Sequence, residues 1–155
     1  MPHTYTNVLV HIIFSTKDRQ PLINAESRDR LFAYMGGVLR DIGATPLIIN
    51  GMDDHPHHLV GVPATRSVSE VVRLVKANSS KWVHEEFPDQ PAFAWQSGYG
   101  AFSVSQSNVD SVRQYIARQE EHHKTMSFQE EYLAFLQRHG IVYEEYLWFC
   151  RPYGA

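Results

Sequence analysis

The chain has 155 residues, of which 43% are hydrophobic and 12% aromatic, and its formal net charge is −3. This length and composition are those of one folded domain with a real core, so the chain does not need disulfide bonds to fold. The one cysteine, Cys150, cannot form an internal disulfide bond. The N-terminal apolar run is too short to span a membrane, and it lacks the basic start of a signal peptide. We therefore expect a cytoplasmic protein.

The negative charge does not exclude a nucleic-acid partner, because the acidic excess lies in one part of the chain. Residues 120–155 hold six acidic and three basic residues, whereas residues 1–119 hold 11 of each. Residues 66–84 carry four basic residues against one acidic residue. A local basic face of this kind can bind phosphate, although charge alone favours an ordinary solvated helix face.

Residues 5–105 alternate between strand and helix patterns. Strands are predicted at 5–16, 45–51, 57–63 and 99–105, where β-branched and aromatic residues gather. A first helix is predicted at 24–43, between a possible N-cap at Asn24 and Gly43, and a second opens at the capping box from Ser67 to Glu70. The order βαββαβ predicts an α+β fold, a ferredoxin-like antiparallel sheet with helices on one face.

Two further helices are predicted after this core. One starts at Ser107 or Asn108, and the other runs from the capping box at Ser127 to Gly140. The aromatic tail at 141–150 is expected to pack back on the body. We therefore expect a single domain made of a core at 1–106, a helix at 107–124 and a C-terminal helix and tail at 125–155. The open sheet face could be covered by a late helix or by a ligand.

The stretch "DDHPHH" at residues 53–58 contains three histidines. If a strand begins shortly before His57, then His55 and His57 share one face of the sheet, and His58 points to the opposite, core face. Two imidazoles on one face have the spacing needed to share a metal ion, and Asp54 could orient one of them. For an isolated pair, an exposed polar turn is the simpler interpretation.

A further ligand and a nucleophile could come from the predicted helix at 107–124. Tyr115 and Gln119 are four residues apart and so share one helix face. Gln119 offers a neutral amide oxygen. The phenol of Tyr115 is a weak nucleophile at neutral pH, but it becomes useful where a metal polarises the electrophile. Taken alone, each is more simply a half-buried tyrosine and a surface glutamine.

Taken together, these segments resemble the single-tyrosine HUH transposases, the family of bacterial insertion-sequence transposases and of relatives associated with REP (repetitive extragenic palindrome) sequences. The resemblance is carried by "HIIFSTKDRQPLI", "DDHPHHLVGVP", "SVSEVVRLVKANSSKWV", "WQSGYGAFSVS" and "VRQYIARQEEHH", in this order over about residues 5–148. Each motif is weak, but their order and spacing make the combination specific.

The resemblance implies a site and a reaction. The family's two metal-binding histidines fall on His55 and His57, its third ligand on Gln119, and its nucleophile on Tyr115. The implied reaction is cleavage and rejoining of single-stranded DNA at hairpin-marked ends, assisted by Mg²⁺ or Mn²⁺, through a 5′-phosphotyrosine link. The resemblance also implies a homodimer, in which Tyr115 of one subunit could serve the histidines of the other, and a bacterial, nucleoid-associated setting.

This sequence departs from the family pattern at two positions. Pro56 stands between the two histidines where an aliphatic residue is usual, and His58 stands where leucine is common. Either change could mark a degraded copy or a tolerated substitution. His11 shares the face of Asn7 and Ser15 in the first predicted strand, so it could line the site or be an ordinary core histidine.

Seven basic residues are candidates for DNA contacts, although each could equally be a solvated surface charge. They follow the first strand, lie on the second helix, or flank the tyrosine: Lys17, Arg19, Arg73, Lys76, Lys81, Arg113 and Arg118.

Two rival functions remain open. The first is a non-catalytic RRM-like nucleic-acid-binding protein, a domesticated or inactive transposase, in which Tyr5, Phe14, Tyr99 and Phe102 could stack on bases. The second is a hydrolase that uses water, with zinc on the histidine pair and a third ligand such as His122 or His123.

Overall fold

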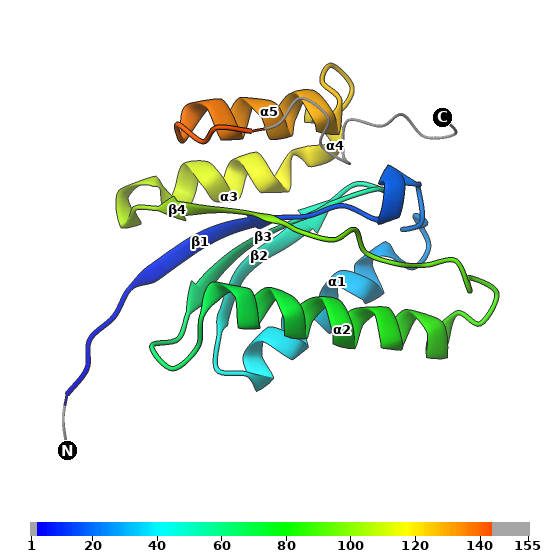
Figure 1. Cartoon of the computed structure of the whole chain (residues 1–155), viewed down its shortest axis with the longest axis horizontal. Coiled ribbons are helices and arrows are strands. Elements are labelled where there is room, and N and C mark those ends of the chain that lie inside the picture. The colour runs from blue at the N-terminus through cyan, green and yellow to red at the C-terminus, as the bar shows by residue number, and fades with distance from the viewer. Residues whose placement is uncertain (1–2, 144–155) are drawn as a thin grey trace.

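Alternation along the central strand divides the molecule into two layers. In the computed structural model, which describes residues 3–143, β1 (Val8–Ile13) sends Val10 and Ile12 to one face of the sheet and Leu9, His11 and Ile13 to the other. The strand pairs antiparallel with β3 on one side and with β4 on the other. The sheet order is β2-β3-β1-β4 (Figure 1).

The remaining elements follow the predicted order with small shifts at their ends. They are η1 (Lys17–Arg19), α1 (Arg28–Asp41), β2 (Thr45–Gly51), β3 (Pro56–Val62), α2 (Val68–Glu86), β4 (Gly100–Val104), η2 (Gln106–Asn108), α3 (Val109–Ala117), α4 (Gln119–His122) and α5 (Phe128–Arg138). The predicted α+β, ferredoxin-like fold is confirmed.

Helices α1 and α2 cover one face of the sheet and enclose the larger core (Figure 1). The predicted capping box at the start of α2 is present, since the Ser67 side chain accepts from the Glu70 amide. The α1 helix begins later than predicted: Asn24 closes a turn by accepting from the Ser27 amide, and regular helix starts at Arg28. At the other end, Gly43 has φ +85°, a conformation that favours glycine.

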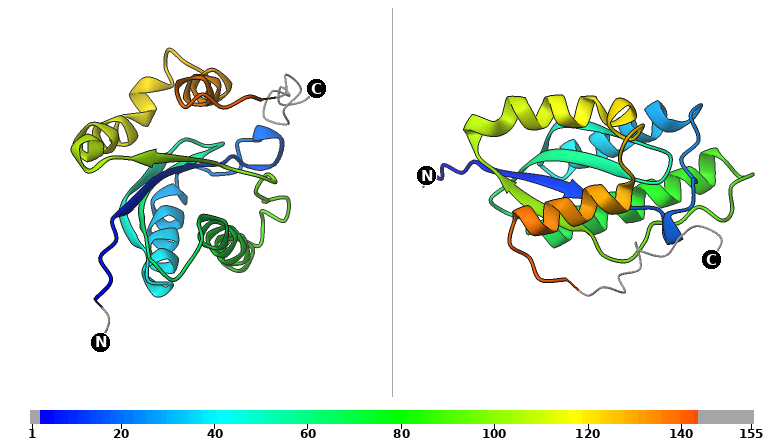
Figure 2. Two further views of the ribbon diagram at one scale, coloured as in Figure 1. Left: turned by 60° about the vertical axis from the view of Figure 1, so that its left-hand side comes forward. Right: turned by 90° about the horizontal axis from the view of Figure 1, so that it is seen from above.

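Helices α3, α4 and α5 cover the second face (Figure 2). Ser127 caps α5 as predicted, by accepting from the Glu130 amide. The helix approaches β4 closely because Gly100 lacks a side chain: a Cβ there would lie 2.9 Å from the Tyr132 hydroxyl. The face that sequence analysis left open is therefore occupied by the late helices.

The predicted single helix at 107–124 is wrong in one respect, because it is broken at Arg118. Arg118 has φ −100° and ψ 24°, and α3 ends at Ala117 while α4 starts at Gln119. The cause is tertiary: the Asn50 side chain on β2 donates to the carbonyls of Ile116 and Ala117, at 2.9 and 3.3 Å. These carbonyls are thus satisfied outside the helix, and the chain turns at Arg118.

The expected packing of the tail at 141–150 falls mostly outside the described residues, but Tyr143 does pack against the cluster around α5. Among residues 3–143, no helix has the length and apolar character needed to cross a membrane.

Candidate active site and metal centre

The turn between β2 and β3 fixes the first histidine. The Met52 amide donates to the His55 carbonyl at 2.9 Å, and the amide of Thr16, beyond β1, donates to the Asp54 carbonyl at 2.9 Å. Gly51 is required by this turn, since a Cβ there would lie 2.2 Å from the His55 carbonyl oxygen. His55 is thereby held immediately before β3.

His55 and His57 share one face of the sheet, as the alternation predicts. Both are fully buried beneath the late helices, whereas His58 faces the opposite core and stacks on Phe14. Pro56 does not displace the pair, because it is the first residue of β3, a position where the missing N–H is tolerated. The two departures from the family pattern therefore leave the geometry of the histidine pair intact.

Each of these imidazoles is oriented by a neighbour on its Nδ1 side. His55 Nδ1 donates to the Asp54 carboxylate at 2.7 Å, and His57 Nδ1 lies 2.8 Å from Nε2 of His11. His11 is thus buried and lines the site. Burial alone would lower the pKa of His55, but its hydrogen bonds to Asp54 and Glu131 raise it to about 9. Burial lowers the pKa of His57 to about 4.

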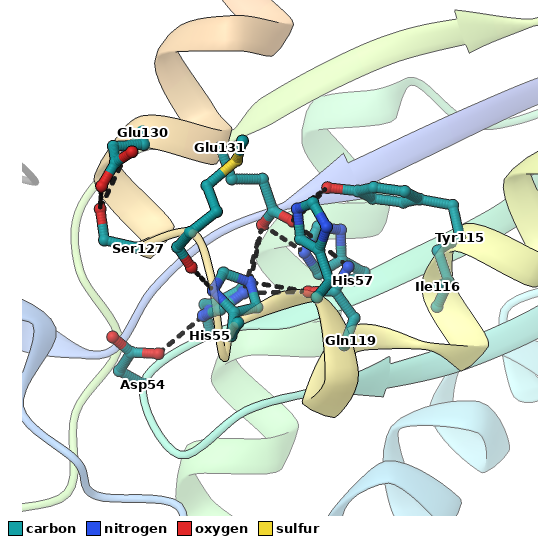
Figure 3. Close-up of polar contacts among 12 residues, drawn as sticks. Asp54, His55, His57, Tyr115, Ile116, Gln119, Ser127, Glu130 and Glu131 are labelled. Atoms are coloured by element: carbon teal, nitrogen blue, oxygen red, sulfur yellow. Dashed lines mark hydrogen bonds and ion pairs between the residues drawn. The ribbon is translucent and has the colours of Figure 1, made fainter.

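Glu131 on α5 lies at the centre of the site and was missed by sequence analysis. Its side chain is 1% exposed, and its Oε1 is 2.9 Å from His57 Nε2, 3.2 Å from His123 Nε2 and 3.4 Å from His55 Nε2 (Figure 3). Burial alone would raise the pKa of this carboxyl, but the hydrogen bonds from the histidines hold it well below its usual range. A signal was present in the sequence.

That signal is an acid within an apolar stripe. Phe128, Tyr132 and Phe135 occupy one face of α5 and are buried, and Glu131 lies among them at helical spacing. A carboxylate on the buried face of a helix requires partners, so its position points to a polar cluster on the facing sheet.

Tyr115 reaches the same cluster from α3. Its hydroxyl donates to Glu131 Oε2 (Figure 3), and it also lies 3.2 Å from His122 Nε2. The ring centroids of Tyr115 and His57 are 6.0 Å apart within one chain. Burial and the negative charge of Glu131 raise the pKa of Tyr115 well above its ordinary value, so the phenol holds its proton in this arrangement.

Gln119 also joins the cluster, although the helix is broken between it and Tyr115. Its Oε1 lies 3.3 Å from His55 Nε2 and 3.0 Å from His123 Nε2, and its Nε2 donates to Glu131 Oε2 at 3.2 Å. The residue is fully buried. The break at Arg118 thus turns Gln119 toward the sheet, and the structure brings together all four residues predicted for the metal and the nucleophile.

The residues present fit a divalent metal ion. One ligand atom each from His55, His57, His123 and Glu131 lies within 4.8 Å of the others. Three imidazoles and a carboxylate are ligands that first-row transition metals accept in proteins. The cluster could therefore bind a metal ion.

The predicted DNA-contacting residues fall into two regions. Near the site, Arg113 and Arg118 are exposed on and after α3, and Arg118 lines a hollow of about 400 Å³ together with Tyr115 and His122. Arg19 in η1 lies 3.5 Å from the side chain of Gln129 on α5. Lys17, also in η1, is exposed.

The other three candidates lie on α2, across the sheet from α3 and α5 (Figure 1). Lys76 donates to the backbone carbonyl of Gln96 at 2.8 Å, and burial lowers its pKa to about 8. Lys81 is exposed and lies 3.9 Å from Glu85. Arg73 and Lys76 line a separate open groove of about 580 Å³. The structure does not bring these residues to the histidine site.

Comparisons with known proteins identify the family. The family model described as "Transposase IS200 like" matches residues 4–119, which is most of the chain. The chain belongs to the IS200-like transposase family. The predicted resemblance is thereby confirmed, and the chain is a transposase, an enzyme class that cleaves and transfers DNA strands.

Individual relatives agree with this assignment. The transposase is 29% identical over 133 residues to the transposase for insertion sequence element IS200 of Salmonella typhimurium strain LT2, covering 80% of this chain and 84% of the relative. The corresponding protein of Salmonella typhi matches equally.

Two solved structures share the fold. A crystal structure from Deinococcus radiodurans R1, assigned as a transposase, has a TM-score of 0.61 at 22% identity and covers 77% of this chain and 96% of its own. A REP-associated tyrosine transposase bound to a REP hairpin has a TM-score of 0.52 at 14% identity, covering 92% of this chain and 74% of its own.

Proposed function

We propose that this transposase cuts and rejoins single-stranded DNA at hairpin-marked element ends, with Tyr115 as the nucleophile. The observation that carries the proposal is the convergence of the Tyr115 hydroxyl, the His55–His57 pair and Gln119 on one buried carboxylate, Glu131. A phenol beside a set of metal ligands is the arrangement that a tyrosine nucleophile needs, since it is unreactive alone at neutral pH.

The reaction proposed is a transesterification at phosphorus. The Tyr115 oxygen forms a bond to the phosphorus of a phosphodiester while the bond to the 3′ oxygen breaks, and that oxygen leaves as a 3′-hydroxyl. The phenolic proton leaves Tyr115 through its hydrogen-bond partners, Glu131 Oε2 or His122 Nε2, and the leaving 3′ oxygen takes up one proton, so the step balances. The product is a 5′-phosphotyrosine link. Attack by another 3′-hydroxyl reverses the step and joins two strands, so no external energy source is needed.

The chain's own residues prepare this step. Asp54 and His11 hold the rings of His55 and His57 so that both Nε2 atoms face α5. Mg²⁺ or Mn²⁺, the ions that the resemblance implies, would supply positive charge beside the scissile phosphate when bound to His55, His57 and Gln119.

The DNA strand is proposed to reach Tyr115 through the hollow that the tyrosine shares with Arg118 and His122. Arg113 and Arg118 would hold phosphates on either side of the nucleophile, and Lys17 and Arg19 would extend this path past the start of α5, where Arg19 lies beside Gln129. The three basic residues of α2 lie on the opposite face of the sheet and so cannot share this path. They would contact a second part of the DNA, such as a hairpin stem.

A hairpin substrate is supported by the structural neighbour, which is a transposase bound to a REP hairpin. A homodimer is proposed on the basis of the family resemblance. Because Tyr115 already lies beside the histidines of its own chain, this proposal does not require the subunits to exchange the tyrosine. Sedimentation velocity of the full chain, with and without hairpin DNA, tests the homodimer.

The nuclease proposal is tested by incubating the protein with single-stranded hairpin DNA and Mn²⁺ and separating the products on a denaturing gel. We expect a covalent protein–DNA band that disappears in Tyr115→Phe. Tyr34→Phe is a matched control, since Tyr34 lies on α1 in the opposite layer, where its ring stacks on Trp82, and this variant should keep the band. Cleavage without a covalent band in the wild type, persisting in Tyr115→Phe, would contradict the proposal.

The hydrolase alternative is favoured by one observation, the position of His123 among the ligand atoms. The same gel separates the two functions, because a water nucleophile cuts DNA without Tyr115. The alternative of a stacking RRM-like sheet is weakened: Phe102 lies beneath α5, stacked on Phe135, and Phe14 is in the opposite core. Tyr5 and Tyr99 are exposed.

A further inference from the structure

The segment after α3 contributes more to the candidate metal centre than the family resemblance implies. Of the four residues whose ligand atoms converge, His123 and Glu131 lie beyond residue 119, where the family match ends. Both come from the part of the chain that begins at the helix break at Arg118.

Each histidine of the cluster is arranged as metal-binding histidines are. The Nδ1 atom is occupied by a neighbour in all three: His55 by Asp54 at 2.7 Å, His57 by His11 at 2.8 Å, and His123 by the Met126 carbonyl at 2.7 Å. With Nδ1 engaged, Nε2 is left to face the common centre, and an outer partner of this kind fixes the tautomer and the ring of a metal ligand.

The spacings from the Glu131 oxygen to the three imidazoles are those of a coordination sphere, and all four donor atoms lie within 4.8 Å of one another. The distances from Glu131 Oε1 to the three Nε2 atoms are 2.9, 3.2 and 3.4 Å. Ligand bonds of 2.0–2.1 Å in a tetrahedral site place neighbouring donor atoms about 3.3 Å apart. The carboxylate oxygen is therefore placed to share an ion with each of the three imidazoles.

We propose that His123 and Glu131 add an imidazole nitrogen and a carboxylate oxygen to the metal centre of His55, His57 and Gln119, and that this centre holds a transition metal ion. This inference rests on the proposed function, in which His55 and His57 hold the ion. Imidazoles favour zinc and its neighbours over Mg²⁺, which takes oxygen ligands and retains water. The centre therefore binds Zn²⁺ more tightly than Mn²⁺, and both far more tightly than Mg²⁺. The two oxygens of Glu131 have different partners: Oε1 faces the imidazoles, and Oε2 accepts a hydrogen bond from the Tyr115 hydroxyl.

Calorimetric titration of the full chain with Zn²⁺, Mn²⁺ and Mg²⁺ tests the proposal. Glu131→Gln keeps the shape of the side chain and removes its charge, and its matched control is Glu130→Gln, an exposed neighbour on the same helix. His123→Gln is paired with His3→Gln, at an exposed histidine near the N-terminus. We expect Zn²⁺ affinity to fall by about tenfold or more in Glu131→Gln and His123→Gln, and to be unchanged in both controls.

A spectroscopic reading does not depend on DNA cleavage. Co²⁺ bound to the wild type should give visible absorption bands, and these bands should change in Glu131→Gln and His123→Gln but not in the controls. If Glu131→Gln fails to fold, as judged by circular dichroism, His123→Gln decides the question.

The outcomes separate this inference from the proposed function. If His57→Gln loses metal binding while Glu131→Gln and His123→Gln keep it, His123 and Glu131 are not ligands and the inference is overturned, but the function stands. An increase of affinity in Glu131→Gln would show that the carboxylate only neutralises the imidazoles, which also overturns it. Unchanged binding in His57→Gln would contradict the proposed metal site itself.

Discussion

Replacing His58 by leucine is predicted to stabilise the fold. The side chain is 2% exposed, and its Nε2 has no hydrogen-bond partner among the described residues. A buried polar nitrogen without a partner costs about 1–3 kcal/mol, whereas the bond from Nδ1 to the Ile12 carbonyl, at 3.2 Å, is worth about 1 kcal/mol. Leucine removes both, so the net gain at pH 7.5 should be about 1 kcal/mol.

The gain should grow as the pH falls. Burial lowers the pKa of His58 to about 4, while an unfolded histidine has a pKa of about 6.5. Below pH 6.5 the unfolded chain therefore binds a proton that the folded chain does not bind until about pH 4, and the wild type loses stability across this window. At pH 5 the loss amounts to about 2 kcal/mol, and at pH 7.5 it is close to zero.

Urea unfolding followed by circular dichroism, with EDTA present, measures this effect at pH 7.5 and pH 5. The free energy of unfolding of His58→Leu should exceed that of the wild type by about 2 kcal/mol more at pH 5 than at pH 7.5. His3→Leu, at an exposed position, should show no such difference. An equal advantage for His58→Leu at both pH values would refute the reasoning.

Three further changes test the framework of the site. Gly51→Ala should cost about 2–4 kcal/mol in urea unfolding, because its Cβ would lie 2.2 Å from a backbone oxygen of the turn, whereas Gly37→Ala, with nothing within 4 Å, should gain about 0.5–1 kcal/mol. Asn50→Ala should cost about 1–2 kcal/mol and slow single-turnover DNA cleavage, because it frees the end of α3; full cleavage speed would contradict this. His11→Ala should weaken Zn²⁺ binding by about 10–100-fold in calorimetry, because it releases the ring of His57, and unchanged affinity would argue against that role.

The sequence predicted the face of each strand residue better than the path of the late helices. Successive side chains of a strand point to opposite faces of the sheet, and a shift of one residue would move each of them to the other face. This alternation along β3 was enough to place His55 and His57 on one face and His58 in the opposite core. The capping boxes at Ser67 and Ser127 likewise located two helix starts within a residue. These are local features, and local chemistry determines them.

The parts that were missed depend on tertiary contacts. No glycine or proline stands at the break at Arg118, so the local sequence does not predict it. The break coincides with hydrogen bonds from Asn50, which is 66 residues away from Ile116 along the chain. The role of Glu131 follows from α5 packing over the histidines, a placement that no spacing in the sequence specifies. Its position in an apolar stripe showed that it needed partners, but not which ones.

The central claim is that Tyr115 attacks phosphorus, and the most direct test is to identify the residue that carries DNA. The covalent product formed on hairpin single-stranded DNA with Mn²⁺ can be digested with nuclease and trypsin and examined by tandem mass spectrometry. We expect a nucleotide 5′-phosphate on Tyr115, within the tryptic peptide that spans residues 114–118. A nucleotide on another residue, or cut DNA with no modified peptide, would contradict it.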